Sequence, residues 1–460
     1  MEEGLQQQTI AAIATPPGRG ALAVVRVSGP RVPEIVKSLG LGELQPRRAS
    51  LRRLVQPRGG GTIDRVLATL FAGPDSYTGE DLLEISSHGG SLLPQLVLDA
   101  VLAAGARPAE PGEFTRRAYL NGRMDLLQAE ATADLIEAQS PALARAALGQ
   151  LERGLSRRIE DLRSRLIEAQ ALVAYDIDFP GEDDGPLDPA RLDEAVTALL
   201  ADIDALLARA PEGEMLREGA LTVIAGRANA GKSSLFNSLV GFERAIVTEH
   251  PGTTRDAIEA VVGIDGYPFR LVDTAGLREA AEEVEVLGIE VAKSYLERAD
   301  VVLFCVEDGR QLESDEVSFL ARLRASGRPT ILVRTKSDLH PSSAERATSE
   351  GNLEGVSSQR LSVGQGVGVA ELGRKMLDAA WSAVRSAPEA PLVTRRRHVR
   401  ALENARRSVE EFARARQASL PAEIAVTNLQ DATLLLEELL GAVTTEDLLD
   451  RVFSSFCVGK

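Results

Sequence analysis

The residues with the clearest chemistry form one loop, Gly-Arg-Ala-Asn-Ala-Gly-Lys-Ser, from Gly226 to Ser233. The spacing matches G-x-x-x-x-G-K-[ST], in which backbone N–H groups surround phosphates, the lysine reaches the β and γ oxygens, and the hydroxyl holds magnesium. A β-branched segment at residues 221–226 predicts a strand before the loop, and residues 233–240 predict a helix after it. This order predicts a nucleotide phosphate site.

Two later motifs supply what a nucleotide switch needs. Thr253 and Thr254 lie in Gly-Thr-Thr-Arg-Asp, where a threonine can join the magnesium shell and sense the γ-phosphate. Asp273 ends the predicted strand 269–273, so its carboxylate should lie beside the metal at the edge of a parallel sheet. The Asp-Thr-Ala-Gly motif that begins there adds Thr274, Ala275 and Gly276 to the predicted site.

A third motif favours guanine as the base. Asp338 closes Thr-Lys-Ser-Asp after the predicted strand 330–334, and its carboxylate can accept hydrogen bonds from guanine N1 and N2, which adenine cannot donate. Thr335 stands where asparagine is usual, and we expect it to loosen the loop without removing guanine selection. Ser362 and Val363 resemble a Ser-Ala element that supports the base. The predicted nucleotide is therefore GTP, with Mg²⁺.

The residue after Asp-Thr-Ala-Gly is Leu277, where Ras-like switches carry the glutamine that orients the attacking water. Leucine cannot orient water, so another residue, a bound cation or a partner protein must do so. Four acids follow, and most are typical of a solvated helix face, so spacing alone does not single out Glu285.

The length and composition of the chain limit its number of domains, its binding partners and its location. A chain of 460 residues predicts two or three domains, and 52 Lys plus Arg against 68 Asp plus Glu give a net charge of −16. Without a global basic field, any RNA contact must be local. Cys305 and Cys457 are the only cysteines, no apolar run approaches a membrane span, and no secretory leader is present. We expect a soluble, reduced, cytoplasmic protein with no membrane contact.

The pattern of apolar residues changes along the chain. Short apolar segments broken by Pro and Gly predict strands and turns to about residue 120, and apolar residues spaced three and four apart from Leu151 to Leu166 predict a long helix. An acidic turn interrupts it at 178–186, helix resumes near Ala190, and 210–213 is expected to close it. After Ser386 helix returns, with Arg395, Arg396, Arg397 and Arg400 at its start.

Motifs along the whole chain resemble those of bacterial tRNA wobble-uridine modification GTPases, the MnmE/TrmE family. In the N-terminal part they are Ala-Thr-Pro-Pro-Gly-Arg-Gly at 14–20, Tyr-Thr-Gly-Glu-Asp at 77–81, His-Gly-Gly at 88–90 and Pro-Gly-Glu-Phe-Thr at 111–115. The chain also ends in Cys-Val-Gly-Lys, like that family's terminal Cys-x-Gly-Lys.

The resemblance implies a multidomain α/β fold. Its expected parts are a folate-binding-like α+β domain (1–120), a discontinuous helical domain (121–213 and 386–460), and an inserted Ras-like G domain with a mostly parallel sheet (214–385). It implies a homodimer that joins an FAD-containing partner of the glucose-inhibited-division type (MnmG/GidA) in a heterotetramer or larger complex. Together they would add an aminomethyl or carboxymethylaminomethyl group to C5 of wobble uridine 34 in certain tRNAs.

The resemblance also implies a tetrahydrofolate derivative, in the 5-formyl or 5,10-methylene form, as one-carbon donor. Carried over residue by residue, its contacts are Arg26, Glu84, Arg123 and Lys460, with arginine at 123 where lysine is common. A carboxylate can pair with pterin N–H groups while cations meet a glutamate tail. Cys457 becomes a functional candidate, as nucleophile, proton donor or neither.

In the G domain, the resemblance implies a potassium ion against the phosphates, where it would stabilise charge as an arginine finger does. Glu285 matches the family's water-orienting glutamate. The implied potassium ligands are Asn229, Thr248, His250 and Thr253, and Mg²⁺ takes Ser233 and Thr254. The remaining nucleotide contacts are Ala230, Gly231, Lys232, Ser234, Thr274, Ala275, Lys336 and Ser362.

An Era-like RNA-binding assembly GTPase without modification chemistry is the alternative. Such a switch should carry an appended basic RNA-binding module, whereas this chain carries the folate-type motifs and a terminal cysteine. The arginines at 395–400 could contact tRNA, but a solvated helix start explains them equally well.

Overall fold

The computed structural model describes residues 8–57, 59–178, 189–242, 258–273, 294–339, 356–386 and 392–460. It divides into two compact units, each assembled from segments distant in sequence. The first combines Met1–Ala133, Leu151–Ser164 and Thr433–Lys460, and the second combines Asp134–Gln150 and Arg165–Ala432. The multidomain mixed α/β fold predicted from the sequence is confirmed, and the domain boundaries stay predictions.

The first unit contains a six-stranded sheet in the order β3-β4-β5-β2-β1-β6. Residues on β2 and β5 alternate between the two faces, so Val25, Val27 and Ile85 enter the core while Arg26 and Glu84 lie on the opposite face. The strands are β1 (Ile10–Ile13), β2 (Leu22–Ser28), β3 (Ser50–Val55), β4 (Thr62–Phe71), β5 (Leu82–His88) and β6 (Arg107–Pro108).

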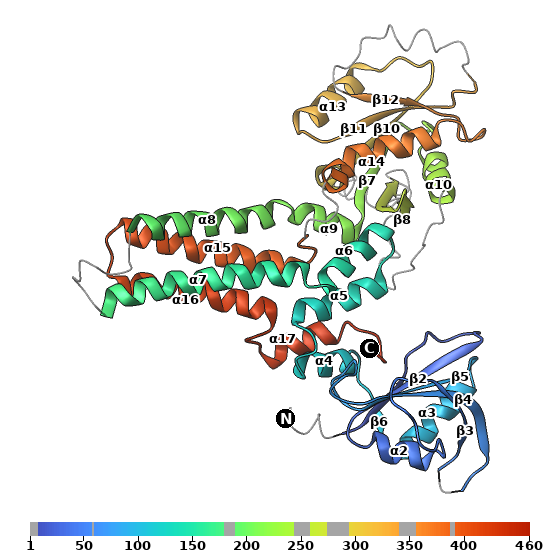
Figure 1. Cartoon of the computed structure of the whole chain (residues 1–460). Helices are drawn as coiled ribbons and strands as arrows, with labels where there is room; N and C mark the ends of the chain where they lie inside the picture. The colour runs from blue at the N-terminus through green and yellow to red at the C-terminus, as the bar shows by residue number, and fades with distance from the viewer. Residues whose placement is uncertain are drawn as a thin grey trace, which may run out of the picture. The chain divides into compact units, whose positions relative to one another are not determined.

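Two helices cover the core face of this sheet, and further helices, among them one near the C-terminus, complete the unit. Apolar residues of α2 (Val32–Ser38) and α3 (Leu93–Ala103) join the sheet core. A second cluster packs α5 (Leu126–Glu137) against α17 (Glu446–Phe453), and α4 (Glu113–Leu120) precedes α5 in the chain. The C-terminal segment therefore belongs to the N-terminal domain's unit (Figure 1).

The second unit contains the G domain, whose sheet has the order β12-β11-β10-β7-β9-β8. All neighbouring pairs are parallel except β8 with β9, so the carboxyl ends of five strands meet at one edge. The strands are β7 (Ala220–Gly226), β8 (Ile258–Ile264), β9 (Tyr267–Asp273), β10 (Val301–Glu307), β11 (Thr330–Thr335) and β12 (Ser357–Arg360). The strands predicted at 221–226, 269–273 and 330–334 are confirmed.

Strand β7 is buried along almost its whole length, as expected for a central strand covered on both faces. Helices α10 (Lys232–Phe242) and α14 (Val369–Ser386) contribute to one apolar cluster with Phe269 and Trp381, whereas α13 (Ser314–Ala325) contributes to the other. Close packing of this kind fixes the ends of the strands at the carboxyl edge.

The long helices are α7 (Gly154–Asp178), α8 (Pro189–Ala208), α15 (Arg396–Gln417) and α16 (Ala422–Leu440). They lie alongside one another (Figure 1): α8 packs on α15, Arg165 of α7 pairs with Asp202 of α8, and Gln170 of α7 donates to Leu429 O of α16. The amphipathic helix predicted from Leu151 to Leu166 is confirmed as α7 from Gly154 onward, whereas Leu151 is the last residue of α6.

The prediction that residues 210–213 close the helical segment is wrong. A further helix, α9 (Ala210–Glu218), begins there, because proline is compatible with the first turn of a helix, where no intrahelical N–H bond is lost. Helix α6 (Pro141–Leu151) likewise begins at a proline. Within the described residues, no helix combines the length and apolar character needed to cross a membrane.

Candidate functional site

The phosphate loop joins β7 to α10 in a conformation that depends on glycine. Gly226 and Gly231 have φ values of +142° and +82°, and a Cβ on Gly226 would lie 2.4 Å from the Cys305 carbonyl oxygen. Asn229 also lies in the left-handed region, with φ +59°, and Ala230 is buried. The loop therefore presses against β10, at the carboxyl edge of the sheet.

The magnesium-type residues meet at this edge. Ser233 Oγ, in the first turn of α10, donates to Asp273 Oδ2 at 2.8 Å, and Asp273 ends β9. A hydroxyl and a carboxylate are hard oxygen ligands, so their chemistry fits Mg²⁺ with phosphate and water completing the shell. Lys232 is buried and its Nζ donates to Arg227 O at 2.8 Å, while Ser234 is exposed on α10.

Thr335 ties the base-recognition loop to the phosphate loop. It is 2% exposed, and its Oγ1 donates to Ala230 O at 2.8 Å and lies 3.3 Å from Val306 O. A Cβ on Gly231 would lie 3.3 Å from the Thr335 side chain. This buried contact to the phosphate loop argues against the loosening that we expected from this threonine.

The proposed guanine acceptor is held in place by a second loop. Ser362 Oγ donates to Asp338 Oδ1 at 2.6 Å, and this hydrogen bond lowers the pKa of the exposed Asp338 carboxyl below its ordinary value. Ser337 N donates to Leu361 O at 3.1 Å, which joins the two loops through the backbone as well. Lys336 has φ +56° and pairs with Glu307 at 2.9 Å. An ionised Asp338 is the state that accepts from guanine N–H groups.

Several predicted residues of the nucleotide and cation sites lie outside the described residues. They are Thr248, His250, Thr253, Thr254, Thr274, Ala275, Gly276 and Glu285. Their roles remain predictions.

A second candidate site lies on the open face of the N-terminal sheet. Arg26 and Glu84 are register partners on β2 and β5, and Glu84 Oε1 accepts from Arg26 Nε at 3.1 Å and Nη2 at 2.8 Å. Arg26 Nη1 also donates to the Gly459 carbonyl oxygen at 3.4 Å. Residues separated by most of the chain therefore form one charged cluster.

Backbone contacts dock the C-terminal tail beside this cluster. Lys460 O accepts from Phe114 N at 3.2 Å, and Cys457 O accepts from Gly112 N at 3.4 Å. A Cβ on Gly459 would lie 2.8 Å from Ile13 O, so the tail approaches the sheet closely. Partial burial and the charge of Arg26 lower the pKa of the Lys460 ammonium.

Sequence reasoning missed two aromatic residues of this cluster. The guanidinium carbon of Arg26 lies 5.4 Å from the ring centroid of Tyr77 and 5.8 Å from that of Phe114. Both residues lie in motifs recognised in the sequence, which was the available signal. Within the described part of the chain, no hydrogen bond or ion pair links Arg123 to Arg26, Glu84 or Lys460. Its guanidinium instead lies 4.0 Å from Asp75.

The two cysteines differ sharply in environment. Cys457 is exposed, whereas Cys305 is fully buried in β10, and burial raises the pKa of the Cys305 thiol to about 12. Only the thiolate is nucleophilic, so Cys305 is unreactive at neutral pH. Accessibility makes Cys457 the thiol that is available for chemistry.

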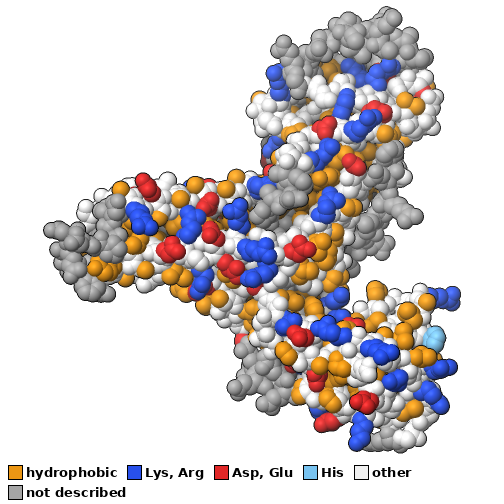
Figure 2. Space-filling view, viewed as in Figure 1, with side chains coloured by type: hydrophobic (Ala, Val, Ile, Leu, Met, Phe, Trp, Pro, Cys, Tyr) orange, Lys and Arg blue, Asp and Glu red, His pale blue; other side chains and the backbone are white. Residues whose placement is uncertain are grey.

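The arginines at the start of α15 make specific ion pairs. Arg395 binds Asp134 through two hydrogen bonds, with Nη2 to Oδ1 at 2.6 Å, and Arg396 pairs with Glu214 at 2.5 Å. On the face that Figure 2 shows, acidic side chains are interspersed with basic ones. The pairing of Arg395 and Arg396 with acids weakens the interpretation of this cluster as a free basic patch for tRNA.

Comparisons with known families cover both ends and the middle of the chain. The family model described as GTP-binding protein TrmE N-terminus matches residues 9–123, and the model described as MnmE helical domain matches residues 126–457.

Relatives that match over their full length point to the same family as these models. The chain is 40% identical to the tRNA modification GTPase MnmE of Moorella thermoacetica over 98% of this chain and 99% of that protein. It is 43% identical to the protein of the same name from Azoarcus sp., over 98% of each. The G domain of the FeoB iron transporter of T. maritima is 28% identical over 35% of this chain and 97% of that chain, but its TM-score of 0.27 supports no inference.

Proposed function

Because this chain belongs to the MnmE family of tRNA modification GTPases, we propose that it couples GTP hydrolysis to folate-dependent modification of wobble uridine 34. Family membership gives the coarser activity: the protein is a GTPase that acts in tRNA modification.

The single observation that carries the folate proposal is the convergence of Arg26, Glu84 and the C-terminal tail on one sheet face. A carboxylate can accept pterin N–H groups, the cations can meet a glutamate tail, and Tyr77 and Phe114 supply aromatic surface. The chemistry of these residues therefore fits a tetrahydrofolate in the 5-formyl or 5,10-methylene form. When bound, it would supply the one-carbon unit that becomes the C5 substituent.

Binding of 5-formyltetrahydrofolate to the full-length protein tests this proposal. Replacing Glu84 with Gln removes the charge that pairs with Arg26, and charged hydrogen bonds of this kind contribute about 1.5–3 kcal/mol, so we expect binding at least about tenfold weaker. Glu34→Gln is the matched control, because Glu34 is an exposed acid on α2 of the same unit. Equal affinity of wild type and Glu84→Gln would reject the site.

The exposed Cys457 lies three residues before Lys460, on the tail that docks beside the folate-type cluster. We propose that its thiol takes part in the modification reaction. A normal modification yield from Cys457→Ser would remove this assignment, and the buried Cys305 is not a substitute thiol.

We propose a homodimer that works with an FAD-containing partner of the MnmG/GidA type on tRNA in the cytoplasm. Exposed apolar side chains support a protein contact on the open face of the N-terminal sheet: Leu51 and Leu67 are cross-strand partners that are 54% and 43% exposed. Leu22, on β2, is 63% exposed. Apolar side chains gathered on one sheet face are typical of interaction surfaces.

For GTP hydrolysis we propose Mg²⁺ at Ser233 and Thr254, K⁺ at Asn229, Thr248, His250 and Thr253, and Glu285 as the residue that orients water. The exposed, left-handed Asn229 beside the phosphate loop supports the cation assignment. A monovalent cation there would offset negative charge as the γ-phosphate is released. We expect faster hydrolysis in potassium than in sodium chloride at equal ionic strength, and equal rates would contradict the assignment.

A further inference from the structure

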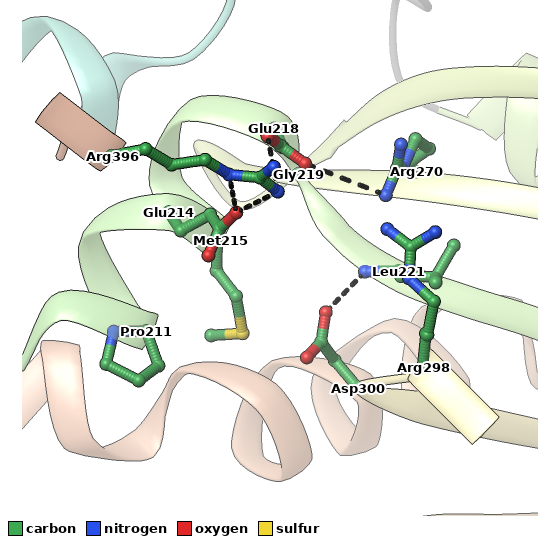
Figure 3. A pocket seen from close by; sticks show the side chains of 10 residues that line it. All are labelled: Pro211, Glu214, Met215, Glu218, Gly219, Leu221, Arg270, Arg298, Asp300 and Arg396. Atoms are coloured by element: carbon green, nitrogen blue, oxygen red, sulfur yellow. Dashed lines mark hydrogen bonds and ion pairs between the residues drawn. The ribbon is translucent and has the colours of Figure 1, made fainter. Parts of the chain in front are cut away.

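A cavity of about 320 Å³ opens in the second unit, at the amino-terminal edge of the G-domain sheet. It is lined by α9, by the start of β7 at Leu221, by Arg270 of β9, and by Asp300, which directly precedes β10 (Figure 3). The phosphate loop leaves the opposite end of β7, at Gly226. This cavity is therefore separate from the nucleotide site.

Most charges in the cavity have partners, and Figure 3 shows the pairs as dashed lines. Glu214 accepts two hydrogen bonds from Arg396, at 2.8 and 2.5 Å. Glu218 lies 3.8 Å from Arg396 and 3.9 Å from Arg270. Asp300 Oδ2 accepts from Leu221 N at 2.7 Å.

Two guanidinium groups retain unused donors. Among the residues that the structure describes, the Arg298 side chain makes no hydrogen bond or ion pair, although it lines the cavity. Arg270 Nε is buried without a hydrogen-bond partner in the same part of the chain. A buried donor without an acceptor is costly. The lining holds three guanidinium groups and three carboxylates, and the unused N–H donors of Arg298 and Arg270 are what an incoming anion would meet.

We propose that this cavity binds a small carboxylate anion, with Arg298 as its main contact and Arg270 as a second donor. A guanidinium presents parallel N–H groups that match the two oxygens of a carboxylate. Met215 and Pro211 form an apolar part of the wall, which suits a short carbon chain. The volume is at the lower end of that of small-molecule sites.

The cavity lies beside both segments that connect the G domain to the rest of the chain, so a bound ligand would contact both. Glu214, Met215 and Glu218 lie on α9, which leads into β7, whereas Arg396 begins α15, which follows the G domain in the chain. A bound anion would contact strands β7 and β9 at the edge opposite the nucleotide. The site is distinct from the GTP and folate sites proposed above.

Equilibrium dialysis of radiolabelled malonate against the full-length protein tests the proposal. The protein is loaded with GDP and Mg²⁺ so that the phosphate loop is occupied, and potassium chloride keeps the ionic strength constant, because screening alone changes weak anion binding. We expect saturable binding to wild type that is at least about tenfold weaker in Arg298→Gln.

A second variant should change the affinity for malonate in the opposite direction. Asp300 places a carboxylate in the cavity, so Asp300→Asn removes like-charge repulsion and should tighten malonate binding by about threefold. Arg324→Gln, at an exposed arginine on α13 outside the cavity, is the matched control and should bind as wild type does. Equal binding by wild type and Arg298→Gln, or binding that never saturates, would overturn the proposal.

Discussion

The nucleotide site and the folate-type site are built in opposite ways. The nucleotide site lies on one parallel sheet, where successive strand ends at Gly226, Asp273 and Thr335 meet at one edge. The folate-type site joins β2 and β5 to the last two residues of the chain. A site of the first kind follows from strand order, whereas a site of the second kind requires the two ends of the chain to be docked.

The same difference decides what could be predicted from the sequence. The phosphate loop, its flanking strand and helix, and Asp273 beside Ser233 followed from spacing, because parallel strands bring their carboxyl ends together. Nothing in the local sequence indicates that Arg26 contacts Gly459, since the contact spans 433 positions. For that site, the resemblance to a known family supplied Arg26, Glu84 and Lys460, and the structure added Tyr77 and Phe114.

Single residues that depart from the usual pattern were harder to interpret from the sequence. Thr335 was expected to loosen its loop, yet its hydroxyl reaches Ala230 O, which depends on how closely Gly231 approaches. Helix α9 was also missed, because Pro211 and Gly213 suggest a turn unless the first helical turn is considered. Local propensity gave the wrong result there because α9 packs on β9 and β7, with Leu216 buried, and this packing favours the helix.

The sharpest way to separate the two sites is to disable one. In Lys232→Ala the buried ammonium that would reach the β and γ phosphates is lost, and we expect GTP hydrolysis to fall by about 100-fold or more. Binding of 5-formyltetrahydrofolate should be unchanged. Lys375→Ala, on α14 of the same domain, is the control and should hydrolyse GTP normally. Loss of folate binding in Lys232→Ala would show that the sites are not independent.

A smaller effect should come from the contact between the two loops of the nucleotide site. Thr335→Val keeps the shape but removes the hydroxyl that donates to Ala230 O, which should weaken GDP binding by about 1 kcal/mol, or roughly fivefold. The control is Thr330→Val, which removes a hydroxyl at the start of β11 that bonds Arg328 O instead. GDP affinities can be compared by fluorescence titration, and an unchanged affinity in Thr335→Val would mean that the contact does not support the site.

The smallest effect should be on the stability of the first unit at acidic pH. Burial alone would raise the pKa of Glu113, but hydrogen bonds from Arg107 and Arg117 outweigh burial and lower it below the ordinary 4.5. A carboxyl with a lowered folded-state pKa stabilises the fold above its unfolded-state pKa, and that contribution is lost as pH falls through the folded-state value.

Glu113→Gln should therefore lower the unfolding temperature at neutral pH by a few degrees, roughly what about 1 kcal/mol produces, and flatten its decline below about pH 4.5. Glu110→Gln, an exposed acid three residues earlier, is the control for the change of charge. Parallel pH curves for wild type and Glu113→Gln would show that the buried pairs do not hold this unit together.

The measurement that tests the central claim most directly is mass spectrometry of wobble uridines in tRNA. Cells lacking the gene are complemented with wild type, Lys232→Ala or Glu84→Gln, and GTP hydrolysis by each purified protein is measured in parallel. If both sites serve one reaction, only wild type should restore the C5 substituent, although Glu84→Gln hydrolyses GTP at the wild-type rate. Full modification in cells carrying Glu84→Gln would contradict the account.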